Sequence, residues 1–460
     1  MTESSTAPHR PVKTSKDAPP AARAEGHEES KEPPTTQDAA EDIPPTWSVD
    51  AYGQTYPDGG RRAWWTLFGC FCTFFASLAL MNSLGSYQAW LASHQLSHES
   101  PDRIGWIFGF YNFIAFFAGV QFGPWFDVYG PRPLSLVGSV ALLASYCLMG
   151  LCVKFWHFFL CIGILGGLAT SLLFTSAICT VQHWFYARRG LATGMAVSGG
   201  SLGGILFPLI LEALFPQIGF AWTTRAKALM LLPFVAAGCL LMEARFSAAV
   251  TRRIVFPDLN VLLNRRVGLM TAAIFFMEWG LFVPLGYISS YALKEGIESR
   301  LAYNMLTFLN VGSLLGRWVP GYLGDKVGRF NTQIMAVSLC IISILAMWLL
   351  AGHRTGFLIA TAVLFGFGSG SNISLTPVCL AQLCPVERFG TFYAAAYTVS
   401  SFGALTGIPV AGALISAAGG EYWGLITFAG VTYAPPAGTR QGQDLSDLEV
   451  LESHKCWDLL

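Results

Sequence analysis

The chain has 460 residues, of which 53% are hydrophobic and only 12% are charged, whereas soluble domains carry about 25% charged residues. This composition excludes a water-soluble protein of this length. The 28 basic and 28 acidic side chains cancel, so the chain lacks the positive surplus typical of nucleic-acid binders, and we expect no nucleic-acid partner.

The first segment, residues 1–57, is polar, acidic and rich in proline, with the pairs Pro19-Pro20, Pro33-Pro34 and Pro44-Pro45. Such a composition cannot bury enough apolar surface to offset the entropy of ordering the chain. The sequence therefore predicts a disordered tail up to residue 57.

The rest of the chain is a series of apolar stretches of about 20 residues, the length that crosses a bilayer core of about 30 Å as a helix. Helices are expected because the hydrocarbon region holds no water to pair with free backbone groups. The predicted spans are Ala63 to Leu84, Ile104 to Phe126, Pro133 to Cys152, Phe155 to Thr180, Leu191 to Leu214, Ala226 to Met242, Val267 to Tyr287, Ala302 to Leu323, Gln333 to Leu350, Phe357 to Leu375 and Phe392 to Ile415.

Basic residues between these stretches fall on one side if the helices alternate in direction. By the positive-inside rule that side is cytoplasmic, and it includes the amino terminus. We expect a multi-pass protein of the plasma membrane. The sequence predicts an N-terminal six-helix half over residues 58–243, a cytoplasmic linker over 244–266 and a C-terminal half over 267–433.

A short motif follows the second helix of each half. Gly123-Pro-Trp-Phe-Asp127-Val-Tyr-Gly130-Pro-Arg132 recurs as Gly321-Tyr-Leu-Gly-Asp325-Lys-Val-Gly328-Arg329. An aspartate at the cytoplasmic mouth can bind positively polarised helix N-termini and arginines, and so hold the two halves together on that side. The candidate gating residues are Asp127, Gly130, Arg132, Asp325, Gly328 and Arg329.

This duplicated motif resembles the loop signature of the major facilitator superfamily. Asp58-Gly59-Gly60 and the stretch from Trp184 to Ala196 are similar to motifs of its monocarboxylate porter branch, especially the fungal members. The resemblance implies an all-α polytopic membrane protein with the major facilitator fold, two pseudo-symmetric six-helix halves that move about a solute. It implies a secondary active or facilitative transporter of a small organic solute, a monocarboxylate or a related organic anion, working by alternating access.

The resemblance also implies where the solute binds. Proton-coupled members carry a lysine in the outer part of the first helix and an aspartate four residues before an arginine in the eighth. Register places Asn82, Ser313 and Arg317 at these positions. Only the arginine is retained, and a guanidinium can bind a carboxylate through two hydrogen bonds. Protons as a coupled partner therefore stay an open question, and facilitated diffusion is an alternative.

A second intramembrane charge is Glu278, about eleven residues and thus roughly 16 Å into the seventh stretch. Lone charges in lipid cost at least ~2.5 kcal/mol, so we expect Glu278 and Arg317 to face the central cavity as a pair or near-pair. The residue patterns leave two roles open for Glu278, a substrate or proton site and a structural partner for the arginine. The candidate substrate-binding residues are Arg317, Glu278, Asn82 and Ser313.

The expected twelfth helix is interrupted. The apolar run from Tyr422 to Tyr433 is too short to span a bilayer, and residues 434–460 form a polar, acidic tail. The switch resembles an altered reading frame or splice variant, and a truncated twelfth helix would impair transport.

Other classes of protein find less support in the residue patterns. The cysteines lie mostly within apolar runs and form no Cys-x-x-Cys pair, so we expect no metal and no cofactor. No HExxH or paired-His pattern lies within the spans, so we expect no enzyme. The open alternatives are an exporter of a secondary metabolite and a truncated, transport-impaired membrane protein or sensor.

Overall fold

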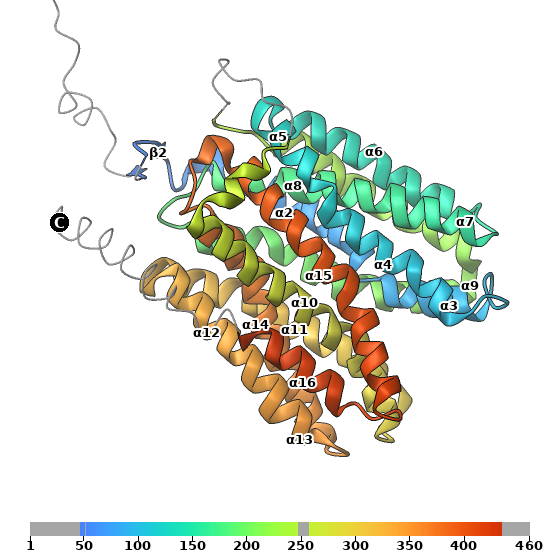
Figure 1. Cartoon of the computed structure of the whole chain (residues 1–460). Coiled ribbons are helices and arrows are strands. Elements are labelled where there is room, and N and C mark those ends of the chain that lie inside the picture. The colour runs from blue at the N-terminus through green and yellow to red at the C-terminus, as the bar shows by residue number, and fades with distance from the viewer. Residues whose placement is uncertain (1–46, 51, 247–256, 435–460) are drawn as a thin grey trace, which may run out of the picture. The chain divides into compact units, whose positions relative to one another are not determined.

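The computed structural model describes residues 47–50, 52–246 and 257–434, which are almost entirely helical (Figure 1). A two-stranded antiparallel hairpin, β1 (Ser48–Val49) and β2 (Thr55–Tyr56), precedes the first helix. The helices of the first half are α2 (Gly60–Met81), α3 (Leu84–Ser93), α4 (Pro101–Phe117), α5 (Gly119–Tyr129), α6 (Pro131–Met149), α7 (Phe155–Phe158), the π-helical η1 (Phe159–Gly166), α8 (Gly167–Gln182) and α9 (Arg189–Leu241).

The second half begins with a short 3-10 helix in the linker, followed by the longer helices. These are η2 (Leu259–Leu263), α10 (Arg265–Lys294), α11 (Ser299–Val327), α12 (Arg329–Ile341), the π-helical η3 (Ile342–Trp348), α13 (Leu349–Ala351), α14 (Thr355–Leu380), the 3-10 helix η4 (Val386–Arg388), α15 (Phe389–Ala417) and α16 (Trp423–Thr432).

Within the described residues, nine continuous helical stretches are long and apolar enough to cross a membrane. The sequence predicts eleven, and two features account for the difference. The 53-residue α9 contains two predicted spans, and the 29-residue α11 is long enough but less apolar because it carries residues such as Asn310 and Arg317.

The long helix α9 reverses direction at Gly219, whose φ of 73° lies in the left-handed region that glycine adopts without steric cost. Gly199 lies against the backbone of Phe71, and Gly238 lies against the side chain of Thr73. The two arms of α9 therefore reach the same depth along α2, on either side of the reversal, as a fifth and a sixth span.

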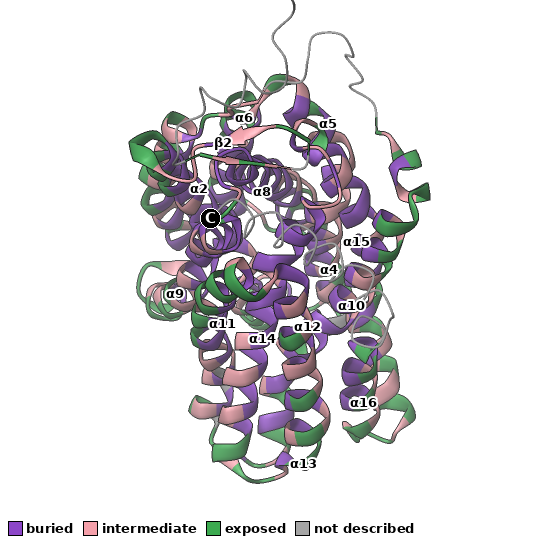
Figure 2. Ribbon diagram, turned by 90° about the vertical axis from the view of Figure 1, so that its left-hand side faces the viewer, coloured by how far each residue is buried: buried purple, intermediate pink, exposed green. Residues whose placement is uncertain are grey.

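Buried and exposed residues are distributed along all the helices (Figure 2). Large apolar residues lie on the surface as well as in the core: Leu240, Leu229 and Val140 are 77%, 70% and 61% exposed. Serine, threonine, asparagine and glutamine side chains are buried among a mainly apolar interior. This pattern suits a body surrounded by lipid, where polar groups must find partners inside the protein.

Each half is held by its own helix pairs, α2 with α9 in the first and α11 with α14 in the second. The halves meet where α9 packs on α11 and where α15 packs on α4 and α5 (Figure 1). We call the end of the helices that carries the linker the linker side. Asp127 lies on this side because nearby Gly130 approaches Ala244 of the linker, and Asp325 lies there because it contacts the start of α9.

Part of the predicted disordered tail is ordered. The strands Ser48–Val49 and Thr55–Tyr56 pair as a hairpin, and Tyr56 is completely buried. Averaging the composition over 57 residues hid this local apolar contact. The remainder of that tail, residues 1–46, lies outside the described residues. The linker is part helical, because η2 lies within it and α10 already begins at Arg265, while residues 247–256 are not described.

The last described helix, α16, has ten residues and packs on α10, α15 and η3. Its Phe428 ring lies 5.2 Å from that of Trp279, and Tyr433 behind it is fully buried. The short apolar run is thus helical and held by the second half. Residues 435–460 of the predicted polar tail lie outside the described residues.

Candidate functional site

Asp127, at the end of α5 in the first half, caps the first turn of α15 in the second. Its carboxylate accepts the backbone N–H groups of Gly390 at 2.9 Å and Thr391 at 2.8 Å, and the Thr391 hydroxyl at 2.7 Å. A helix N-terminus carries unpaired N–H groups and partial positive charge, so a carboxylate is well matched to it. We call this arrangement the Asp127 cap.

Asp325, at the end of α11 in the second half, caps the first turn of α9 in the first. Its carboxylate accepts the N–H groups of Gly190 and Leu191, both at 2.8 Å. The capped amides are the second and third of α9, the same two positions that Asp127 caps in α15. This Asp325 cap therefore repeats the Asp127 cap with the halves exchanged.

The first glycine of each motif copy lets the capped helix approach. A Cβ on Gly123 would overlap the carbonyl oxygen of Gly390, and a Cβ on Gly321 would lie 2.6 Å from that of Gly190. Both glycines stand one helical turn before their aspartate, so the backbone contact brings the carboxylate to the helix start. The first glycine of each copy is thus required by the packing of one helix against the other.

The last glycine of each copy forms the turn into the next helix. Gly130 and Gly328 have φ of 74° and 108°, values that L-residues with a side chain rarely adopt. The arginines that follow differ between copies. Arg132 is exposed, whereas Arg329 is buried, lies 3.7 Å from the Asp325 carboxylate and donates to the carbonyl oxygen of Tyr186.

Three of the four predicted substrate-binding residues gather along one face of α9. The Asn82 amide donates to the carbonyl oxygen of Gly200 at 2.8 Å. The Ser201 hydroxyl donates to that of Ser313 at 3.3 Å, and the Arg317 guanidinium donates to the carbonyl oxygen of Val197. Their contacts on α9 span residues 197–201, or about 6 Å along the helix.

The expected pair of Glu278 and Arg317 is not formed. No ion pair joins them among the described residues, and within that part of the chain Oε2 of Glu278 and Nε of Arg317 have no hydrogen-bond partner. Glu278 lies instead close enough to Tyr393 and Tyr397 of α15 to interact with them electrostatically. Depth along the helices suggested the pair, but depth alone does not fix the direction in which a side chain faces.

A buried lysine in the first half was missed by the sequence reasoning. Lys227 is 1% exposed, donates to the carbonyl oxygen of Ala79 at 3.2 Å and to the Ser83 hydroxyl at 3.1 Å, and lies 4.7 Å from the centre of the Phe207 ring. Its signal in the sequence is a single charge just inside the sixth apolar stretch. The partners of the two caps were missed as well, although both helix starts share an Arg-x-Gly pattern, Arg188 to Gly190 and Arg388 to Gly390.

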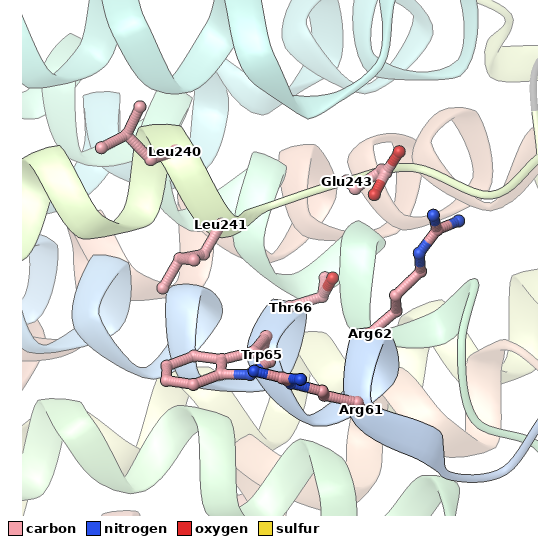
Figure 3. Close-up of a pocket in the computed structure, with 7 residues that line it drawn as sticks. All are labelled: Arg61, Arg62, Trp65, Thr66, Leu240, Leu241 and Glu243. Atoms are coloured by element: carbon pink, nitrogen blue, oxygen red, sulfur yellow. The ribbon is translucent and has the colours of Figure 1, made fainter.

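An open pocket of about 630 Å³ lies at the linker side between the start of α2 and the end of α9 (Figure 3). None of its lining residues is a predicted site residue, and its position at the helix ends separates it from Arg317 and Glu278. The lining residues are Arg61, Arg62, Trp65, Thr66, Leu240, Leu241 and Glu243.

Sequence comparisons agree with this architecture. Residues 69–408 match the family model described as Major Facilitator Superfamily. An MFS-type transporter of Penicillium oxalicum, opdF, is 34% identical over 82% of this chain and 89% of its own. The riboflavin transporter MCH5 of Saccharomyces cerevisiae is 34% identical, covering 79% and 74%, and the aspyridones efflux protein apdF of Emericella nidulans is 33% identical, covering 80% and 74%.

A solved structure shares the fold. The human organic anion transporter MFSD10 superposes with a TM-score of 0.67 over 82% of this chain and 99% of its own, at 14% sequence identity. At that identity the likeness shows the fold alone. The family match and the curated relatives cover most of the chain, and the chain belongs to the Major Facilitator Superfamily of membrane transporters.

Proposed function

We propose that this transporter carries a small organic anion, a monocarboxylate or a related carboxylate, by alternating access. The pair of helix caps carries the proposal. Each aspartate joins the end of one half to the start of a helix in the other, and both lie on the linker side. The halves must break these bonds to expose a solute site on that side, so the caps bias the equilibrium between the two access states.

The carboxylate preference rests on Arg317. Its guanidinium is 97% buried and Nε has no hydrogen-bond partner within the described residues. An incoming carboxylate would replace the single bond to Val197 by two charge-assisted bonds. Asn82 and Ser313, on the same face of α9, supply further polar contacts.

Uptake into liposomes that contain the purified full-length chain tests this role. We expect labelled lactate or pyruvate to enter faster than the neutral amide of the same size, and Arg317→Gln to raise the KM for the carboxylate about 10- to 100-fold. Arg225→Gln, on α9 but over Trp222 at the far end, is the matched control. Equal carboxylate uptake by the wild type and Arg317→Gln would remove Arg317 from the site.

Coupling to protons is tested at Glu278. If the carboxyl group carries a proton, uptake depends on a proton gradient and Glu278→Gln removes that dependence. Flux that ignores the gradient in the wild type assigns the chain to facilitated diffusion. Absence of uptake for every solute at every gradient supports the transport-impaired alternative.

A second candidate, export of a secondary metabolite, is favoured by the likeness to the aspyridones efflux protein apdF. We place the protein in the plasma membrane with the linker side and the amino terminus in the cytoplasm. Cells that express the chain would then release an endogenous carboxylated metabolite faster than cells that do not. Inside-out vesicles distinguish export from import, because an exporter would move the solute into the vesicles and an importer would move it out of them.

A further inference from the structure

We propose that the described residues 47–50 and 52–58, before the first membrane helix, hold the linker side closed by positioning Tyr186 for the Asp325 cap. The inference rests on the proposed gating role of that cap and adds positioning residues to it. We call residues 47–50 and 52–58 the hairpin segment.

The hairpin segment orders itself through Asp50. One carboxylate oxygen accepts the N–H groups of Tyr52 and Gln54, both at 2.9 Å, and the other accepts the Tyr56 hydroxyl at 2.7 Å. A two-stranded hairpin alone is marginally stable in water. The order of this one therefore depends on what it packs against.

Its main contact is the loop between α8 and α9. The Tyr56 ring stacks on that of Tyr186 with centroids 5.4 Å apart, and it meets the Phe246 ring edge-on at 5.5 Å. The guanidinium of Arg189 lies 5.3 Å from the Tyr56 ring and 5.2 Å from the Tyr186 ring. Tyr56 thus shields a buried arginine at the first residue of α9 and fixes the Tyr186 ring beside it.

Asp58 fixes the backbone of the same loop. Its carboxylate accepts the N–H groups of Tyr186 at 2.7 Å and Arg188 at 3.2 Å, and also the Ser48 hydroxyl. Asp58 holds φ at 44°, a left-handed conformation uncommon for a residue other than glycine. The chain adopts it where the carboxylate must turn back onto the loop.

The loop in turn reaches the second half. The carbonyl oxygen of Tyr186 accepts a hydrogen bond from Arg329, whose guanidinium also lies 5.5 Å from the Tyr186 ring and pairs with Asp325. Tyr186 is therefore held by the hairpin segment on one side and bound by Arg329 on the other. Separation of the halves breaks the second contact, so the hairpin segment favours the closed state by keeping Tyr186 in place for it.

The linker also contacts the hairpin segment through Arg245. Arg245 donates to the carbonyl oxygen of Thr55 and contacts its side-chain oxygen at 3.2 Å, and its guanidinium lies 4.8 Å from the Trp47 ring. Arg245 is in the stretch that joins the two halves. Movement of the halves that displaces the linker would therefore reach the hairpin segment directly.

Distance measurements between spin labels on the full-length chain test the proposal. Labels on p-acetylphenylalanine, which avoid the eleven cysteines, replace Tyr129 of the first half and Val327 of the second, which are 61% and 56% exposed. We expect Asp58→Asn and Tyr56→Ala to move the open-to-closed ratio about tenfold toward the longer distance. Tyr56→Phe keeps the stacked ring but loses the hydrogen bond to Asp50, so it should shift the ratio less than Tyr56→Ala does. The control is Glu243→Gln, an exposed carboxylate on the same side, which should stay near wild type.

Asp325→Asn separates this inference from the proposed function. If Asp325→Asn lengthens the distance but Asp58→Asn and Tyr56→Ala keep the wild-type distribution, the role of the hairpin segment is overturned and the cap remains. If Asp325→Asn leaves the distance unchanged, the cap itself fails. If the Asp58 variant does not purify as a folded protein, Arg245→Gln takes its place. A shift toward the longer distance, smaller than that expected for Asp58→Asn, would support the proposal, and a wild-type distance distribution would contradict it.

Discussion

The Asp127 cap and the Asp325 cap use the same two backbone amides of the helix that they bind, but their surroundings differ. Asp127 gains the hydroxyl of Thr391 and, within the described residues, forms no ion pair. Asp325 gains the buried Arg329, which extends to Tyr186. The duplicated motif thus preserves the capping geometry, while the added partner is a hydroxyl at one copy and a buried guanidinium at the other.

This difference bears on how the linker side opens. Asp325 and Arg329 belong to the same half and stay paired when the halves separate, but opening at this cap also breaks the bond from Arg329 to the carbonyl oxygen of Tyr186, whereas opening at Asp127 breaks its bonds to Gly390 and Thr391. The Asp325 cap should therefore be the more costly of the two to break, and the more sensitive to charge-changing substitutions.

Replacing each aspartate by asparagine should have the largest effect on the closed linker side. An amide has one oxygen and cannot accept both backbone N–H groups as the carboxylate does. We expect Asp325→Asn to destabilise the closed linker side by about 2–3 kcal/mol and Asp127→Asn by about 1–2 kcal/mol. The measurement is alkylation of Cys384, which is 1% exposed on the linker side, by a membrane-impermeant maleimide followed by peptide mass spectrometry.

The control for this pair is Glu421→Gln, which removes an exposed ion pair with Lys294 and should leave the alkylation rate unchanged. Equal rates for the two aspartate variants would contradict the charged support assigned to the Asp325 cap.

Substitution of the arginines of the two motif copies should also distinguish the caps, with a smaller effect on the closed state than substitution of the aspartates. Arg329→Gln removes the link between Asp325 and Tyr186, and we expect it to cost the closed state about 1–2 kcal/mol. Arg132→Gln changes an exposed side chain and should stay within about 0.5 kcal/mol. The same alkylation assay compares them, and an effect of Arg132→Gln as large as that of Arg329→Gln would show that the exposed arginine has a role on opening.

The fold was largely predictable because its signals are local. Apolar stretches of span length and the repeated glycine and aspartate positions are read directly from neighbouring residues. The capping partners cannot be read in this way, because Asp127 and Gly390 lie 263 residues apart and neither motif identifies the helix that it contacts. The structure places Asn82, Ser313 and Arg317 against one face of α9, an arrangement that the sequence analysis did not predict, and their role in binding the solute stays a prediction.

Two features could not be predicted from the sequence because they depend on how the helices pack in three dimensions. Depth of Glu278 along its helix follows from residue counting, but each residue turns a helix by about 100°, and the facing direction of α10 is set by packing on α15. The order of the hairpin segment depends on Tyr56 meeting Tyr186, a contact that the polar composition of the surrounding residues conceals.

His183 supplies the smallest predicted effect and probes the linker side through pH. Its ring lies between those of Phe126 and Phe246, at 5.3 Å and 5.6 Å; burial, and then the positive charge of Arg189, lower its pKa to about 3. An exposed histidine titrates near 6.5, so an opened state binds the proton more tightly than the closed one. Closure is then fully supported above about pH 6.5 and weakens as the pH falls toward 3.

Between pH 7.5 and pH 6.0 the closed-to-open ratio should fall about fourfold if opening exposes the ring. Burial raises the pKa of Asp58, so that carboxyl group shifts the ratio in the opposite direction as the pH falls. The comparison of wild type with His183→Phe isolates the histidine, because phenylalanine keeps an aromatic ring between Phe126 and Phe246 and cannot bind a proton. The same pH response in both proteins would place His183 in an environment that opening does not change.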